Sequence, residues 1–336
     1  MTASRWAIVS FFLVSLCAGA QAEPGDPSHS ELEAIQHFLV IPSTVAQVTD
    51  AYFSTHAFEI PEFILIQDVH RHPEVQGHIA SLILQGYRQW GVKKVFLEGA
   101  FTGVDLSMFH RLPDQTRGLL LSRLVQNGDL SGAELATVLL TETEWSNPQP
   151  SPFQLFGMED PKLYRQNIAA YQEVTSLREE ALQEIVAIRR LQSEMNLPQS
   201  NILTQQLDRT ETLIRLKLTP VDYEAYLQAR EVIPSSPRLD PAVHAAEKFY
   251  DLVQRRSFVF IRQAQKEAPA SPGPRVLVVG GFHTPVMARY LRESGRSFVV
   301  LTPHVTKVGY GPLYEEHMME SVSALNIPEH PTAKSH

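Results

Sequence analysis

The sequence predicts an α/β fold in which a mostly parallel sheet is flanked by helices and interrupted by a long helical insertion before its last strands. Five short apolar runs have the nearly continuous hydrophobic character of strands that are covered on both faces, and turn-forming or polar residues follow each of them. Between the third and fourth runs, the chain from Pro161 to Ala268 is instead charged, rich in glutamine and strongly helix-favouring.

The first residues have the pattern of a secretory signal peptide. Arg5 precedes an apolar run from Trp6 to Leu16, and Ala20-Gln21-Ala22 has the small-x-small pattern of a cleavage site. We therefore expect export to the periplasm or the extracellular space and a mature chain that begins near Glu23. The apolar run is about half as long as the roughly 20 residues of a transmembrane helix, so no transmembrane segment is expected in the mature chain.

Cys17 is the only cysteine and lies within the expected signal peptide. Leu16 stands where a lipobox requires a small residue, which argues against a lipid anchor at Cys17. Cleavage after Ala22 would remove this cysteine. The mature chain would then have no disulfide, no thiolate metal ligand and no cysteine nucleophile.

Composition limits the partners. The formal net charge is −8, and Lys and Arg form no cluster. Binding to nucleic-acid phosphates requires clustered positive charge, so we expect no nucleic-acid partner. With 336 residues, of which 43% are hydrophobic, the chain can form one large domain with an insertion. The expected partner is a small-molecule or peptide substrate, and the composition leaves the oligomeric state open.

The elements of the sheet follow in order along the chain. Pro73 stands at a first helical position, the apolar residues that follow share one face, and Gly91 ends the helix, so the first two strands belong to a β-α-β unit. Upstream, residues 45–53 have β-like character and are expected at the sheet edge as the first arm of a hairpin that reaches Ile60. The five main strands are expected at Phe63–Ile66, Val95–Leu97, Phe153–Phe156, Val276–Val279 and Phe298–Leu301.

Prolines divide the insertion into about four helices, of which the first and last are long enough to pack as a hairpin. We expect no sheet strand inside it, and its first helix should start at the site and wall it, where it could act as a lid. A linker rich in Pro, Ser and Gly at 268–274 leads back to the sheet. The expected organisation is a signal peptide at 1–22, the first part of the α/β domain at 23–160, the insertion at 161–268, the second part at 269–326 and a disordered tail at 327–336.

Four of the expected strands are each followed at once by residues that can perform chemistry. In open α/β sheets, ligands bind beyond the carboxyl ends of the strands, so residues distant in sequence should converge there. The four segments are Gln67-Asp68-Val69-His70, Glu98-Gly99, Gly157-Met158-Glu159-Asp160 and Gly280-Gly281-Phe282-His283-Thr284. We expect His70, Glu98, Glu159 and His283 to form the site.

Each residue also has an ordinary structural interpretation. His70 could bond only to the backbone, and Glu98 could cap the turn at Gly99. Asp160, which precedes Pro161, fits an ordinary helix N-cap. The pair Gly280 and Gly281 could serve only close packing, but paired glycines also let the backbone approach a ligand and would direct His283 into a cleft. The coincidence at four strand ends is what favours a functional site.

The four motifs together resemble those of the superfamily that joins the erythromycin esterase-like proteins, the Tiki/TraB proteins and the ChaN haem-binding lipoproteins. Within it, the chain is most similar to a bacterial group that carries Gln-Asp-x-His and Gly-Gly-Phe-His-Thr. The match covers residues 60–160 and 275–305. The first motif of the superfamily is usually Gly-x-x-His, often with glutamate second in the esterase-like branch. Here Gln67 replaces the glycine and Asp68 the glutamate, while His70 matches.

The resemblance indicates a site more firmly than a reaction. Tiki proteins resemble metal-dependent proteases, the esterase branch hydrolyses a lactone with histidine as base, and ChaN binds haem. The leading hypothesis is an exported metal-dependent hydrolase of a peptide, ester or amide. His70 and His283, with Glu98 or Glu159, would bind zinc, manganese or cobalt, and the other carboxylate would act as general base. The two imidazole nitrogens would then lie roughly 3–4 Å apart.

Three alternatives stay open. A metal-free hydrolase would use His70 as base, oriented by a carboxylate. Asp68 is counted among the candidate catalytic residues. A haem or tetrapyrrole carrier would use the insertion helices and aromatic residues as an apolar face for the macrocycle. The chain could also have lost chemistry and serve as a surface interaction module.

Overall fold

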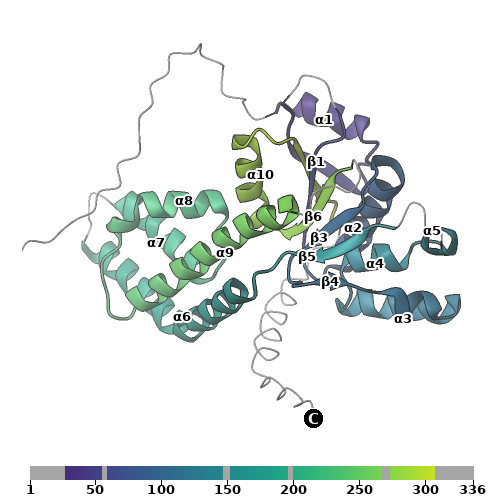
Figure 1. Ribbon diagram of the computed structural model, residues 1–336. Coiled ribbons are helices and arrows are strands. Elements are labelled where there is room, and N and C mark those ends of the chain that lie inside the picture. The colour runs from purple at the N-terminus through teal and green to yellow at the C-terminus, as the bar shows by residue number, and fades with distance from the viewer. Residues whose placement is uncertain (1–26, 55–58, 147–151, 196–199, 267–272, 307–336) are drawn as a thin grey trace, which may run out of the picture.

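The computed structural model describes residues 27–54, 59–146, 152–195, 200–266 and 273–306. The expected signal peptide, the expected tail and most of the expected linker lie outside these residues. The core of the molecule is a seven-stranded sheet of order β1-β7-β2-β6-β3-β5-β4, with helices on both faces (Figure 1). The predicted α/β class with a mostly parallel sheet is confirmed.

Five parallel strands form the centre of the sheet. β2 (Phe63–Asp68) pairs with β6 (Arg275–Gly280) on one side and with β7 (Phe298–Pro303) on the other. β3 (Lys94–Leu97) lies between β6 and β5 (Gln154–Gly157). These are the five apolar runs that the sequence predicts as strands. The four strands that carry the predicted site residues are therefore consecutive neighbours in the sheet.

The two edges of the sheet are antiparallel. β1 (Ala46–Tyr52) pairs with β7, not with a hairpin arm at Ile60, so the predicted hairpin is wrong. Its alternating burial suits a strand with one covered face, but its partner arrives from the far end of the chain, which no local pattern reveals. At the other edge, β4 (Gly103–Val104) pairs with β5 and, with two residues, is too short to leave a sequence pattern.

Alternate residues of the central strands point into two different apolar layers. Ile64 and Ile66 pack with one set of helices, whereas Phe63 and Leu65 pack with another. The first layer is covered by α1 (His29–Phe38), α2 (Pro73–Gln85) and α4 (Gly132–Val138). The second is covered by α10 (His283–Glu293) and the end of α9 (Asp240–Lys266). This is a three-layer α/β/α arrangement.

The remaining elements of the first part follow the β-α-β unit. A π-helical turn at Gly86–Trp90 extends α2, and Gly91, with φ of 74°, ends it as predicted. No residue range was predicted for the helices that lie between β4 and β5 along the chain. They are a 3-10 helix at Ser107–Arg111, α3 (Asp114–Asn127), α4 and α5 (Glu142–Ser146).

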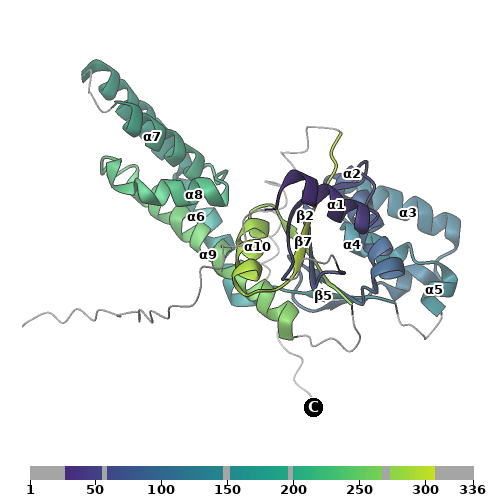
Figure 2. The same cartoon turned by 90° about the horizontal axis from the view of Figure 1, so that it is seen from above.

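Within its described residues, 161–195 and 200–266, the insertion consists of helices joined by turns and contains no strand, as predicted. The helices are α6 (Pro161–Met195), α7 (Ser200–Ile214), α8 (Pro220–Gln228), a 3-10 turn at Arg230–Val232, and α9. α6 and α9 run side by side and carry α7 and α8 away from the sheet as an arm (Figures 1 and 2). Among the described residues, no helix is long and apolar enough to cross a membrane.

α9 belongs both to the arm and to the sheet layer. Its first half contributes Phe249, Tyr250 and Val253 to the apolar core of the arm. Its second half contributes Phe260 and Ile261 to the core under the sheet. The residues between these halves are consequently held at the junction, next to the carboxyl ends of the strands.

Candidate functional site

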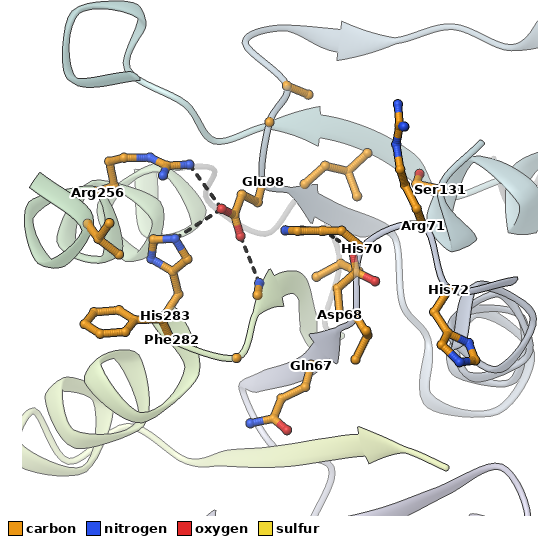
Figure 3. Close-up of a pocket in the computed structure, with 18 of the residues that line it drawn as sticks. Gln67, Asp68, His70, Arg71, His72, Glu98, Ser131, Arg256, Phe282 and His283 are labelled. Carbon is orange, nitrogen blue, oxygen red and sulfur yellow. Dashed lines mark hydrogen bonds and ion pairs between the residues drawn. The ribbon is translucent and has the colours of Figure 1, made fainter. Parts of the chain in front are cut away.

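A cleft of about 920 Å³ lies beyond the carboxyl ends of β2, β3 and β6. Its size falls within the range of about 300–1,000 Å³ that is usual for small-molecule sites. It is lined by His70, Glu98 and His283 together with residues of α6 and α9 (Figure 3). Glu159 lies behind Glu98. The two carboxylates are joined by Arg256, whose Nη2 donates to both of them.

Glu98 is the centre of the site. Its Oε2 accepts the Gly280 N–H at 2.8 Å, and its Oε1 lies 3.1 Å from both Arg256 Nη2 and His283 Nε2. Burial raises the pKa of Glu98, but the charges and hydrogen bonds of His283, Arg256 and His70 outweigh burial and hold the pKa well below its usual range. The Glu98 carboxylate is therefore ionised at neutral pH.

Glu159 is fully enclosed by protein. Its carboxylate receives two bonds from Arg256, Nη2 to Oε1 at 2.5 Å and Nε to Oε2 at 3.2 Å, and its side chain has no exposed area. Oε1 also accepts the N–H of Gly99, whose φ of 80° explains the need for glycine at this turn. Glu159 thus supports the site from behind and does not face the cleft.

Asp160 is an N-cap, as predicted. Its Oδ1 accepts the backbone N–H groups of Lys162 and Leu163, each at 2.9 Å, in the first turn of α6. These two hydrogen bonds fix the start of the insertion immediately after Glu159.

Arg256 is a site residue that no sequence motif marks. It lies on α9, its side chain is 7% exposed, and its Nη1 donates to Asn167 Oδ1 on α6 at 2.9 Å. Burial lowers the pKa of the guanidinium, but the two carboxylates raise it above its ordinary value, so it is always charged. A signal was present: Arg256 falls on the apolar stripe of α9 with Val253 and Phe260, where a buried cation requires acidic partners.

His283 is the first residue of α10 and is buried. Its Nδ1 lies 2.8 Å from Ser257 Oγ, and its Nε2 is the atom that contacts Glu98. Ser257 is on α9, next to Arg256, and its Oγ is also 3.0 Å from the Val253 carbonyl. Both ring nitrogens of His283 are consequently engaged by protein groups. No sequence motif marks Ser257.

His70 and Asp68 form a hydrogen-bonded pair at the end of β2. His70 Nδ1 lies 2.6 Å from Asp68 Oδ2, and Asp68 Oδ1 accepts from Gln76 Nε2 at 2.7 Å. Gln76 is buried on α2 and accepts the Gly132 N–H at 2.6 Å, so the aspartate is held by a fixed neighbour. The carboxylate therefore orients the imidazole through Nδ1 and directs Nε2 elsewhere.

His70 is the most accessible of the four predicted residues, with a side chain that is 27% exposed. Burial lowers its pKa, but the charge and hydrogen bond of Asp68, with the charge of Glu98, outweigh burial and raise the pKa to about 9. Arg256 acts in the opposite direction. The imidazolium is therefore the favoured form of His70 at neutral pH.

Gly280 connects the two halves of the site. A Cβ at this position would stand 3.4 Å from Glu98 Oε2 and 3.5 Å from His70 Nε2, so both groups approach the same glycine. Gly281, in contrast, is exposed and faces open space. The Glu98 carboxylate lies between the two histidine rings (Figure 3), instead of the histidines facing one another directly as expected for a shared ion.

The donor atoms proposed for a metal are engaged by protein partners. Glu159 and Glu98 share the Arg256 guanidinium, and both nitrogens of His283 are bonded. Within the described part of the chain, no group of three or more His, Cys, Asp or Glu residues is arranged to hold a metal ion. A divalent cation would also lie beside a buried guanidinium, where like charges repel. The residues present do not fit the metal centre that the motifs suggested.

The insertion supplies one wall of the cleft, as predicted for its first helix. Asn167, Tyr164 and Ile168 of α6 line it. Leu216 and Leu218, between α7 and α8, line it as well. The far side is lined by Arg71, Ser131 and other polar residues (Figure 3).

In comparisons with known proteins, no protein-family model, no curated protein and no solved structure matched this chain. The resemblance to the esterase-like superfamily therefore rests on the strand-end motifs alone.

Proposed function

We propose that this protein is a hydrolase of ester or amide bonds in which His70, oriented by Asp68, is the general base. The observation that carries the proposal is the 2.6 Å contact between His70 Nδ1 and Asp68 Oδ2 at the mouth of the cleft. A carboxylate that holds one nitrogen of an imidazole fixes its tautomer and leaves the other nitrogen to exchange protons with a substrate or water.

The proposed reaction needs no enzyme nucleophile. His70 Nε2 takes a proton from a water molecule while the water oxygen bonds to the carbonyl carbon. The bond to the leaving group then breaks, and the imidazolium returns the proton to the leaving oxygen or nitrogen. The products are a carboxylic acid and an alcohol or amine.

The other site residues would have supporting roles. Glu98, fixed by Gly280, Arg256 and His283, would hold the cationic form of His70 after it takes the proton. The backbone N–H groups of His283 and Thr284, the first two residues of α10, have no acceptor within the helix and would stabilise the negative carbonyl oxygen of the intermediate. The signal-like first residues would place this reaction outside the cytoplasm.

The test is hydrolysis of p-nitrophenyl acetate and of the corresponding anilide by the chain purified without its signal peptide. His70→Ala and Asp68→Asn should lower kcat/KM by at least about a hundredfold, the contribution usual for general base catalysis. His78→Ala is the matched control, because His78 bonds to the His304 carbonyl and does not line the cleft. Unchanged turnover in His70→Ala would refute the proposal.

The metal-dependent and haem-binding alternatives are separated in the same preparation. Metal analysis and assays with chelator should give no stoichiometric metal and undiminished turnover if His70 acts alone. Stoichiometric metal with loss of activity in chelator would restore the metal-dependent hydrolase. A Soret band after haem titration, without turnover, would favour the carrier.

A further inference from the structure

The cleft is divided into two chemically different sides. On the side of α4, it is lined by Asp129, Ser131, Glu134 and Arg71. On the side of the arm, it is lined by Asn167, Lys217 and Arg256 together with a larger number of apolar and aromatic residues of α6, α9 and the start of α10. These apolar residues are Tyr164, Ile168, Phe249, Tyr250, Val253 and Phe282.

The apolar side is held together by contacts between aromatic rings. Phe282 packs on Tyr250 with ring centroids 5.3 Å apart, and Tyr250 stacks on Tyr223 at 4.7 Å. The Tyr250 hydroxyl accepts the Leu218 N–H at 2.8 Å, so this hydroxyl is already engaged by the backbone of the arm. What this wall contributes to the cleft is therefore mainly ring faces and aliphatic groups, which favour contact with an apolar ligand.

The two sides lie on opposite flanks of Glu98. His70 is on the polar flank, and His283, Phe282 and Arg256 are on the arm flank (Figure 3). A carbonyl that is attacked by water from the direction of His70 would therefore extend one of its two substituents along the apolar wall.

We propose that the arm side of the cleft is an acyl-binding site, and that the substrates are esters or amides of apolar carboxylic acids of medium chain length. This inference rests on the proposed hydrolase function. The acyl chain lies against Val253 and Phe282, with Tyr250 packed behind Phe282, and the polar leaving group lies towards Ser131 and Arg71. The helical insertion is thus the specificity element of the enzyme, whereas the sheet edge carries the catalytic base.

The first test compares p-nitrophenyl acetate, butyrate, hexanoate and octanoate. The value of kcat/KM should rise by about fourfold for each methylene until the wall is covered, which corresponds to the usual transfer free energy of a buried methylene. Val253→Trp should abolish the preference by filling the site. Asp251→Trp, which adds the same side chain on the exposed face of α9, should retain it. Phe282→Ala, a second variant that removes wall area without overpacking, should weaken it.

A second test does not depend on turnover. Calorimetry with p-nitrophenyl octyl ether and p-nitrophenyl methyl ether, which lack a scissile carbonyl, should give at least about tenfold tighter binding of the octyl compound. Val253→Trp should remove this difference. Equal binding of the two ethers, or equal kcat/KM for all four esters, would overturn the acyl-binding site. Selective binding of the octyl ether without hydrolysis of any ester would leave the acyl-binding site standing and refute the proposed reaction.

Discussion

The guanidinium of Arg256 and the carboxylate of Glu98 meet at 3.1 Å although the two residues are 158 positions apart. Arg256 comes from α9 of the helical arm, and Glu98 follows β3. The same guanidinium binds Glu159 through two nitrogens. One buried cation therefore joins the arm to two strand ends and sets the charge of the floor of the cleft.

Replacing Arg256 by an uncharged residue should lower the free energy of unfolding. Arg256→Met leaves two buried carboxylates without their partner, and we expect the free energy of unfolding to fall by about 3–5 kcal/mol. The measurement is urea denaturation followed by circular dichroism at neutral pH. Arg255→Met, on the exposed face of the same helix, should change stability by less than about 1 kcal/mol. A similar small loss in both variants would show that the buried network does not stabilise the fold.

The pH dependence of turnover follows from His70. Because its pKa is raised to about 9, the base form accumulates only as pH approaches that value, so kcat/KM should rise from pH 6 and level off above about 9. Asp68 raises this pKa, Glu98 adds to it and Arg256 opposes it. In Asp68→Asn, the residual activity should level off at lower pH. If the rise of kcat/KM with pH levels off at the same pH in Asp68→Asn as in wild type, His70 is not the group whose titration causes the rise.

The raised pKa of His70 also makes the free energy of unfolding depend on pH. A histidine whose pKa is higher in the folded state than in the unfolded state stabilises the fold fully below its unfolded pKa. For His70, this stabilisation is present below about pH 6.5 and is lost as pH rises through about 9. The difference in unfolding free energy between wild type and His70→Gln should therefore shrink across this window. A difference that grows with pH would contradict the sign.

Ser257 should act through His283. Its hydroxyl lies 2.8 Å from Nδ1 and fixes the ring that contacts Glu98. Ser257→Ala should lower kcat by roughly tenfold with little change in KM, while Ser257→Thr, which keeps a hydroxyl, should recover part of the loss. Steady-state kinetics with p-nitrophenyl esters would measure both. If Ser257→Thr is no more active than Ser257→Ala, the hydroxyl does not position His283.

The two glycines that precede α10 should differ in tolerance. A Cβ at Gly280 would contact both Glu98 and His70, and branched side chains would displace them, whereas Gly281 faces open space. We expect Gly280→Val to lose nearly all activity and Gly281→Ala to retain most of it. Circular dichroism would confirm that both variants fold. Equal activity in the two variants would mean that close approach at Gly280 is unimportant.

Much of the fold was predictable because local patterns carry it. The apolar run at residues 63–66 and its four counterparts are long enough to mark central strands, and Asp160 before Pro161 marks the start of the first arm helix. The edge strand 46–52 was visible, but its partner was not, because pairing with β7 joins two ends of the chain.

The candidate site, like the fold, was predictable from the sequence only in part. The strand-end pattern was enough to place His70, Glu98, Glu159 and His283 after strands of one parallel sheet, since topology brings such residues to one edge. Which of the four side chains are accessible, and which groups they contact, depends on long-range packing. Arg256 and Ser257 carry no motif and reach the site only because α9 packs across both the arm and the sheet. A buried carboxylate takes the partner that long-range packing brings to it, and that partner cannot be inferred from its neighbours along the chain.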